Sequence, residues 1–303
     1  MRILITGATG RLGTVLSAHL RSAGHEVLCF SRRSGPGLCR LDSLPEQIRT
    51  GADAVLHLAW SSVPASAEKE PSLSNNGDLE LLTSLLQNST HGAAAVEGPL
   101  FVFFSSCSVY GEPSPLRTSP FEEDDKPEPI GKYASAKLSA ERIIEDTRQF
   151  GTRALVLRVS NPFGFPQPPG RPQGIIPTAL DAALAGKTLE IWGDGTAEKD
   201  FLDVRDFCTA VARSLEMNLT GVFNVCSGEN RPINEVLDLI ERLAKKSLSR
   251  LYRPSAAWDV RTARYSNTKF CSLTGWKPAI PFETGLTDYI QSADRQKLPA
   301  QTS

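Results

Sequence analysis

The sequence predicts an α/β protein, a doubly wound parallel sheet with a smaller mixed α/β lobe beside it. Two observations predict this fold. Residues 2–13, Arg-Ile-Leu-Ile-Thr-Gly-Ala-Thr-Gly-Arg-Leu-Gly, pass from an apolar run into a turn with three glycines. Beyond them, apolar runs alternate with amphipathic stretches to about residue 161, the pattern of right-handed β-α-β units.

The opening segment predicts a strand, a glycine turn and a helix in succession. The run 3–5 is typical of a fully buried strand, and Gly7, Gly10 and Gly13 follow it. A helix N-terminus presents unpaired N–H groups and a partial positive charge to a pyrophosphate, and glycines let the backbone approach closely. An ordinary βα loop has the same outline. The strand before and the helix after favour a dinucleotide-binding turn.

The composition excludes several classes of partner. The chain has 303 residues, 40% hydrophobic and 22% charged, with a formal net charge of −1. This charge argues against nucleic acid and against an anionic membrane surface. No apolar run approaches the ~20 residues of a membrane span, and the first residues begin a core strand rather than a signal peptide. Six scattered cysteines without CxxC pairs predict buried thiols, no metal site and a cytoplasmic location.

The end of the second predicted strand, Glu26–Phe30, bears on the choice of cofactor. A dinucleotide fold that prefers NAD usually has Asp or Glu there, ~20 residues past the glycines, to hold the ribose 2′-hydroxyl. This chain has Ser31, Arg32 and Arg33. Guanidinium groups bind a 2′-phosphate that a carboxylate would repel, and Arg11 in the glycine turn adds a third. The sequence favours NADP(H), with NAD as the alternative if the arginines form a solvated turn.

Two further strands are expected to end near the ligand. Asp53–Ala59 lines the cofactor groove, with His57 as a packing residue rather than a catalytic one. Leu100–Phe104 ends in a hydroxyl-rich segment, where open α/β sheets bind ligands. A largely buried helix is predicted over 73–86. The acidic run 122–125 is interpreted as a solvated face, not a metal site.

Tyr133 and Lys137 open a predicted helix and, four residues apart, project from one face. A phenol has a reference pKa near 10 and is a poor base at neutral pH. A neighbouring ammonium and a positively charged nicotinamide favour the phenolate and lower that pKa. The YxxxK pattern is weak alone. It becomes strong after a glycine-turn strand and a serine-rich strand end.

The remaining chain is expected to divide between the two lobes. Residues 1–161 plus about 202–226 form the dinucleotide-binding domain. About 162–201 plus 227–291 form the second lobe, and 292–303 a frayed tail. The expected elements are a strand at 154–159, an irregular segment at 162–177, helices at 178–185, 204–215 and 233–243, and a strand at 222–225.

These motifs together resemble the extended short-chain dehydrogenase/reductase family, in its nucleotide-sugar epimerase/dehydratase branch, with UDP-glucose 4-epimerase-like members on a Rossmann fold. The resemblance covers nearly the whole chain. It rests on Thr6–Gly13, His57–Ala59, Ser105-Ser106 before Val109-Tyr-Gly111, Tyr133, Lys137, Leu157–Gly164, Gly174–Pro177, Trp192–Gly195, Lys199–Asp206 and Gly275–Pro278.

The resemblance implies roles for single residues. Ser106 would hydrogen-bond the reacting sugar oxygen, Tyr133 would be the acid/base, and Lys137 would bind the nicotinamide ribose. The implied substrate contacts are Ser106, Tyr133, Asn161 on the diphosphate, Trp192 on the nucleobase, Lys199 and Arg253; a core position in the second lobe is the alternative for Trp192. The implied cofactor contacts are Gly7, Gly10, Arg11, Leu12, Gly13, Ser31, Arg32, Arg33, Asp42, Leu58, Ala59, Tyr133 and Lys137.

Departures from the family pattern limit the activity. Dehydratases have Asp-Glu after the active-site Thr, and Cys107-Ser108 stands here, which argues against water elimination. The leading hypothesis is a 4-epimerase acting on a UDP-hexose or UDP-N-acetylhexosamine. The alternatives are an NADPH-dependent NDP-4-keto-6-deoxyhexose reductase, favoured by Ser31, and a non-catalytic dinucleotide-binding protein. Family members are commonly homodimers through a helix bundle that includes the Tyr133 helix.

Overall fold

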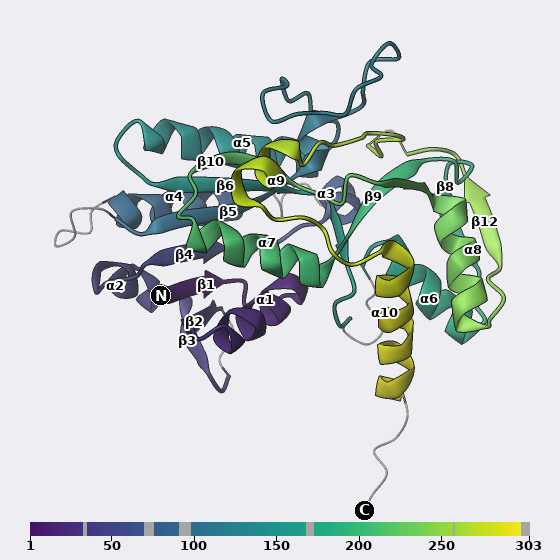
Figure 1. Ribbon diagram of the computed structural model, residues 1–303, viewed down its shortest axis with the longest axis horizontal. Helices are drawn as coiled ribbons and strands as arrows, with labels where there is room; N and C mark the ends of the chain where they lie inside the picture. Colours follow the sequence, from purple (N-terminus) through teal and green to yellow (C-terminus); the bar gives the residue numbers. More distant parts are fainter. Residues whose placement is uncertain (33–34, 70–75, 91–97, 168–172, 257, 298–303) are drawn as a thin grey trace, which may run out of the picture.

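The computed structural model describes residues 1–32, 35–69, 76–90, 98–167, 173–256 and 258–297. Its main body is a seven-stranded sheet in the order β10-β6-β5-β4-β1-β2-β3, with every neighbouring pair parallel (Figure 1). The strands are β1 (Arg2–Thr6), β2 (Glu26–Ser31), β3 (Leu38–Arg40), β4 (Ala54–His57), β5 (Leu100–Ser106), β6 (Ala154–Val159) and β10 (Gly221–Val225). The predicted doubly wound parallel sheet is confirmed.

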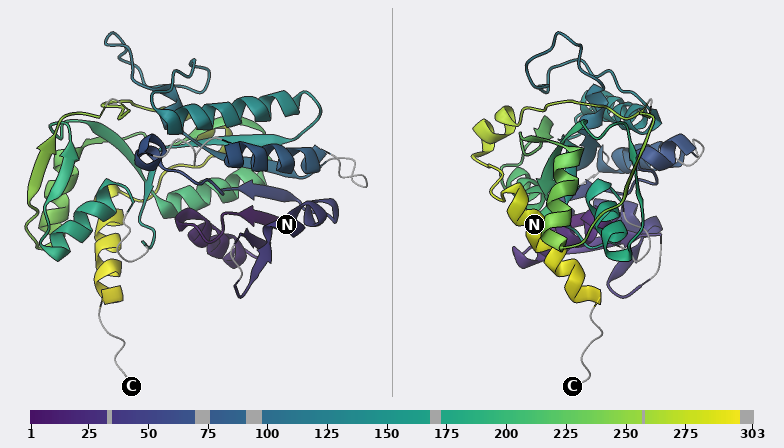
Figure 2. Two further views of the ribbon diagram at one scale, coloured as in Figure 1. Left: turned by 180° about the vertical axis from the view of Figure 1, so that it is seen from behind. Right: turned by 90° about the vertical axis from the view of Figure 1, so that its right-hand side faces the viewer.

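Helices cover both faces of this sheet (Figure 2). Side chains alternate across the strand, so Ile3 and Ile5 join one buried cluster and Leu4 the other. The first face carries α1 (Arg11–Ser22), α7 (Val204–Glu216) and α9 (Thr268–Thr274); the second carries α2 (Leu44–Arg49), α4 (Asn76–Thr90) and α5 (Lys132–Arg148).

The position of β1 locates the ligand crevice. This strand lies inside the sheet, between β4 and β2, as its uninterrupted apolar run predicts. The chain builds outward from β1 to β2 and β3 on one side and to β4, β5 and β6 on the other. Ligands of open α/β sheets bind at the carboxyl ends of the strands where the order reverses, so the crevice is expected outside Thr6 and His57.

A second lobe lies at one end of the sheet, on the right in Figure 1. Its core contains Phe163, Ile191, Phe201 and Leu237, all buried. The elements of this lobe are β7 (Asn161–Phe163), β8 (Leu189–Trp192), β9 (Glu198–Asp203), β11 (Asn230–Pro232), β12 (Arg250–Arg253), α6 (Ile175–Ala185), α8 (Ile233–Ala244) and α10 (Phe282–Lys297). Strands β11-β9-β7 form one small sheet and β12-β8 another.

Two predicted boundaries and one lobe assignment are wrong. Helix α6 begins at Ile175, within the segment predicted to be irregular. Helix α10 continues to Lys297, so the tail predicted from 292 begins inside a helix. Phe270 and Trp276, assigned to the lobe, pack in the main sheet's core instead, because α9 returns to β10 and Phe270 meets Phe223 edge-on at 5.8 Å.

Short elements join the larger ones: η1 (Leu41–Ser43), α3 (Pro64–Lys69) and η3 (Cys107–Tyr110). The acidic run is solvated as predicted only at Glu122 and Asp124. Glu123 is buried and accepts the N–H of Asn224 at 2.8 Å, and Asp125 pairs with Arg117. In the described part of the chain no carboxylates, imidazoles or thiols gather as metal ligands would. No described helix has the length and apolar character to cross a bilayer.

Candidate active site

The turn between β1 and α1 has the geometry that a pyrophosphate requires. Gly7 has φ +71°, and a Cβ there would lie 2.6 Å from the Ala59 nitrogen. A Cβ at Gly13 would lie 2.2 Å from the Gly7 carbonyl oxygen. Gly10 precedes α1 without a side-chain cap. A bare helix N-terminus behind a turn that tolerates no Cβ fits an anionic dinucleotide, with Arg11, Leu12 and Gly13 as its first N–H donors.

The far end of the crevice, where a ribose 2′-phosphate would lie, is formed by β2 and β3. Ser31 ends β2 in register with Arg40 of β3, and Arg32 follows it, exposed. The Arg40 guanidinium is held by Asp42 at 2.7 Å, so Asp42 is in an ion pair rather than poised alone for a ribose. Arg33 lies outside the described residues.

Arg11, the third guanidinium that the sequence offers for this end of the crevice, is hydrogen-bonded to two glutamines. Its Nε donates to Gln167 Oε1 at 2.8 Å, and its Nη1 donates to Gln173 Oε1. Both glutamines belong to the segment between β7 and α6. Arg11 therefore connects the glycine turn to the second lobe.

The floor of the crevice is β4. The Leu58 N–H donates to the Thr6 carbonyl at 3.2 Å, and the Ala59 N–H approaches Thr6 Oγ1 at 3.4 Å. His57 is 1% exposed, stacks near Phe103, and its Nδ1 hydrogen-bonds Thr6 Oγ1 at 2.8 Å. Burial, with the nearby charge of Lys137, lowers the pKa of His57 to about 3. It is a neutral packing residue, as expected.

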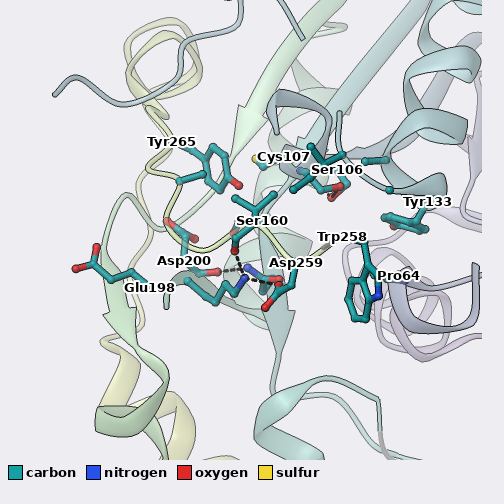
Figure 3. A pocket seen from close by; sticks show the side chains of 18 of the residues that line it. Pro64, Ser106, Cys107, Tyr133, Ser160, Glu198, Asp200, Trp258, Asp259 and Tyr265 are labelled. Carbon is teal, nitrogen blue, oxygen red and sulfur yellow. Dashed lines mark hydrogen bonds and ion pairs between the residues drawn. The ribbon is translucent and has the colours of Figure 1, made fainter. Parts of the chain in front are cut away.

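One pocket at the junction of the sheet and the lobe brings together four predicted site residues. Ser106, Tyr133, Asn161 and Lys199 all line it. In Figure 3, Ser106 and Tyr133 lie on one side, and Asp200 and Asp259 on the other. Residues from β5, α5, β7 and β9 thus meet, although up to 93 positions separate them in the sequence.

Ser106 ends β5 and is oriented by the turn after it. Its Oγ accepts the N–H of Ser108 at 3.2 Å and the hydroxyl of Ser108 at 2.9 Å. Because Ser106 is the acceptor in both bonds, its own hydroxyl proton is directed to a further acceptor, such as a ligand oxygen. Next to it, Cys107 is buried, and burial raises the pKa of its thiol well above the ordinary value.

Tyr133 lies in the first turn of α5, whose N-terminus is capped from outside the helix. Gly131 supplies no cap; instead Glu68 Oε1 accepts the Lys132 N–H at 2.6 Å. A Cβ at Gly131 would come within 3.0 Å of both Glu68 and Trp258, so α3, α5 and the 258–260 segment meet closely there. Burial raises the pKa of Tyr133 to about 12, opposite to the lowering expected from the sequence.

Lys137 follows one turn later and is 5% exposed. Its Nζ donates to the Phe104 carbonyl at 2.9 Å and lies 3.9 Å from the ring centre of Trp60. Burial lowers the pKa of Lys137 to about 7, against the opposing charges of Asp78 and Glu141. The loss of hydration thus outweighs both carboxylates.

A buried ion pair fixes α5 to the sheet. Arg158 of β6 binds Glu141 of α5 at 2.7 Å, with both side chains 7% exposed or less. Ser105 donates to the same carboxylate, and Arg158 Nη1 donates to Tyr110 Oη at 2.8 Å. Tyr110 Oη in turn donates to Asn224 Oδ1 at 2.8 Å. Tyr133, Lys137 and Glu141 are spaced four apart on one helix, so this network sets where the first two point.

The opposite wall holds the groups expected to meet a diphosphate. Asn161 Nδ2 donates to the Asp200 carbonyl at 2.8 Å. The Lys199 ammonium binds Asp259 Oδ1 at 2.7 Å and the Val260 carbonyl. Burial raises the pKa of Asp200, whose oxygens accept the N–H groups of Ser227 and Gly228. Asp200 therefore anchors backbone, and Lys199 faces the pocket with a carboxylate beside it.

Two predicted substrate residues lie outside this pocket. Trp192 is 51% exposed at the end of β8, which excludes the core position considered for it. Arg253 is its register neighbour on β12 and pairs with Glu190 at 2.6 Å. Arg253 lines a separate open depression with Asp194 and Tyr252.

Sequence reasoning missed Trp60, Glu68, Trp258, Asp259 and the Glu141–Arg158 pair. Each acts through a contact between distant segments that no local pattern encodes. A signal existed only for Glu141, which continues the four-residue spacing of Tyr133 and Lys137.

Comparison with known proteins agrees with this geometry. The family model described as NAD dependent epimerase/dehydratase family matches residues 3–226. A GDP-6-deoxy-D-mannose reductase of Pseudomonas aeruginosa is 30% identical over 299 residues, which cover 94% of each chain. The UDP-glucose 4-epimerase of Thermotoga maritima, solved with UDP-glucose, has a TM-score of 0.87 at 25% identity, covering 98% of this chain and 99% of its own. The structure of RMD from Pseudomonas aeruginosa complexed with NADPH has a TM-score of 0.81 at 29% identity, covering 98% and 100%.

The fold and site define an extended short-chain dehydrogenase/reductase, an enzyme that works with a nicotinamide dinucleotide. The chain belongs to the NAD dependent epimerase/dehydratase family.

Proposed function

We propose that this protein is a nucleotide-sugar 4-epimerase that acts at C4 of a UDP-hexose or UDP-N-acetylhexosamine. The observation that carries the proposal is the pocket where the Ser106 hydroxyl and the Tyr133 phenol face Asn161 and Lys199. Two proton-handling groups on one wall and a cation on the other suit a sugar linked to a diphosphate. The similarity to a UDP-glucose 4-epimerase supports the same substrate class.

In the proposed reaction a bound nicotinamide supplies a reversible hydride acceptor. Ser106 donates a hydrogen bond to the C4 oxygen and orients it, and keeps its own proton. Tyr133 removes the proton from that oxygen and later returns it, and the charge of Lys137 favours the phenolate while this happens. Epimerisation also requires the sugar ring to turn over between the two proton transfers. Cys107 is a buried thiol with a raised pKa, which makes it unsuited to the acid role that water elimination needs.

For the cofactor we propose NADP(H) in preference to NAD(H). The support is Ser31 where NAD-binding chains have a carboxylate, with exposed Arg32 after it and Arg40 in register beside it. One aligned charge-assisted contact is worth about tenfold in affinity. Titration with both dinucleotides tests this, and Arg32→Ala is expected to reduce the preference. Equal or tighter NAD(H) binding would contradict it.

A second candidate is an NADPH-dependent reductase of an NDP-4-keto-6-deoxyhexose. It is favoured by the same Ser31 and by the similarity to a reductase and to an NADPH complex. This reaction uses Ser106, Tyr133 and Lys137 once and releases oxidised cofactor. A homodimer through a bundle that includes α5 also stays a prediction, which light scattering of the purified protein tests.

One experiment separates the candidates. The purified protein is incubated with UDP-glucose or UDP-galactose, and their N-acetylated forms, without added cofactor. Interconversion, with dinucleotide released on denaturation, supports the epimerase. Consumption of NADPH with an NDP-4-keto-6-deoxyhexose, without interconversion, supports the reductase. If neither reaction occurs, both proposed reactions are wrong for these sugars.

A further inference from the structure

The ammonium of Lys137 is surrounded by aromatic rings. Its Nζ lies 3.9 Å from the ring centre of Trp60, 4.7 Å from that of Phe103 and 5.9 Å from that of Tyr133. All three distances fall within the ~6 Å over which a ring face attracts a cation, and an indole attracts most strongly. Trp60 is therefore both the closest and the strongest of these partners.

Hydrogen bonding does not account for this position. An ammonium has three N–H donors, and within the described residues Lys137 uses one, to the Phe104 carbonyl at 2.9 Å. The side chain is 5% exposed, which leaves little room for water. Ring faces thus make up much of the surroundings of this ammonium.

Trp60 is itself held by contacts with Phe103 and with the Lys137 ammonium. It follows β4, directly after Ala59, and meets Phe103 edge-on at 5.7 Å. Its Nε1–H is buried and has no hydrogen-bond partner among the described residues. The orientation of the indole is thus set by its ring contacts and by the ammonium.

We propose that Trp60 is a positioning residue for Lys137. Its indole face binds the Lys137 ammonium and holds it on the side of α5 that carries Tyr133. We call this contact the seat of Lys137. The inference rests on the proposed function only for the catalytic roles of Tyr133 and Lys137. The seat itself is a feature of the protein without ligands. It keeps a positive charge beside the phenol in a pocket where burial favours the neutral amine.

The other groups that face Lys137 come from three elements. Asp78 of α4 and Glu141 of α5 favour its charged form, and burial opposes it. His57 of β4 is neutral because its pKa is lowered to about 3, and Tyr133 is a neutral phenol. The indole face of Trp60, like the two carboxylates, favours the charged form of Lys137.

Fluorinated tryptophan tests the seat without changing its shape, because fluorine weakens the negative face of the ring. The protein is produced with mono-, di- and trifluorinated tryptophan, and Lys137 is titrated by NMR of carbon-13-labelled lysine. Lys137→Ala identifies its resonance. We expect the pKa of Lys137 to fall stepwise with each fluorine, by about one unit in all.

Trp60→Phe is the matched background, in which the other three tryptophans are still fluorinated. In Trp60→Phe we expect no stepwise fall in the pKa of Lys137. In Trp258→Phe, a substitution at the pocket rim, we expect the same stepwise fall as in the native sequence. A pKa that ignores fluorination in the native sequence overturns the proposal, as does an equal fall in Trp60→Phe. The titration uses the protein without cofactor and needs no turnover. If the sugar assays fail, the proposed role of Trp60 is unaffected. If the titration fails, the proposed function is unaffected.

Discussion

Burial shifts the pKa values of Tyr133 and Lys137 more than either residue shifts the pKa of the other. It raises the pKa of Tyr133 to about 12 and lowers that of Lys137 to about 7. Near neutral pH the phenol is therefore protonated, and the lysine is near the midpoint of its titration. The charge that faces the phenol is set by the seat of Lys137, not by spacing along the helix alone.

Tyr133→Phe is expected to reduce turnover by about 10²–10⁴-fold while dinucleotide binding changes little. The ring still packs at the start of α5, but the proton acceptor is gone. Steady-state rates with a dinucleotide titration measure both quantities. A rate near that of the native sequence would show that the YxxxK match is coincidental.

Lys137→Met is expected to abolish activity and to stabilise the protein by about 1–4 kcal/mol, because an apolar chain of similar length replaces a buried charge. The gain depends on pH. Below pH 7 the native state must hold the buried ammonium, so the full penalty applies; as pH rises from about 7 toward the unfolded pKa of 10.5, the penalty disappears.

Urea unfolding at several pH values checks this dependence. The stabilisation by Lys137→Met should be largest at and below pH 7 and shrink steadily above it. A gain that does not vary with pH would show that Lys137 is not buried as an ammonium.

Sequence reasoning at this scale succeeds where contacts are local. The glycine spacing predicts the turn, and the four-residue spacing places Tyr133 and Lys137 on one face. It gives no information where the partner is remote: Arg11 is hydrogen-bonded to Gln167 and Gln173, which lie 156 and 162 positions away. Hydrophobic periodicity carries no information about such polar partners.

At the scale of elements, α5 is the rigid support of the site. Its N-terminus is capped by Glu68 of α3, and its middle is tied to β6 by Glu141 and Arg158. The period of apolar residues predicts this helix well. The residues that form α9 were assigned to the second lobe but pack on the main sheet, because apolar residues do not state which of two cores they cover.

Glu141→Gln is expected to destabilise the fold by about 3–5 kcal/mol, since it leaves the buried Arg158 guanidinium without its counter-charge. Glu145→Gln is the matched control on the same helix. Its partner Arg148 is at the surface, so a change under about 1 kcal/mol is expected. Urea unfolding of both variants measures the difference, and equal effects would argue that the buried pair contributes no more than a surface pair.

At the scale of the molecule, the pocket exists because the two lobes meet over it. The larger lobe contributes Ser106 from β5 and Tyr133 from α5, and β9 of the second lobe contributes Lys199. The 258–260 segment then brings Asp259 against Lys199 and Trp258 against Gly131. The sequence predicts both lobes and the cation Lys199. The carboxylate that pairs with Lys199, that of Asp259, lies 60 residues later and is identified only in the folded chain.

This pairing means that a nucleotide diphosphate must compete with Asp259 for Lys199. The two side chains are 33% and 21% exposed, so the pair is worth about 1 kcal/mol at most. Asp259→Asn removes the competing charge and is expected to tighten UDP binding up to about fivefold at low salt. In a Lys199→Met background the same substitution should give no gain, because the cation it frees is absent.

Asp288→Asn, which removes a carboxylate from an exposed pair with Arg205, controls for net charge. Calorimetric titration with UDP at two salt concentrations measures all four variants, and the Asp259→Asn gain should shrink as salt screens the phosphate. Equal gains from Asp259→Asn and Asp288→Asn would mean that only the overall charge matters. A gain confined to chains that retain Lys199 would place the diphosphate beside that lysine, at the contact between the lobes.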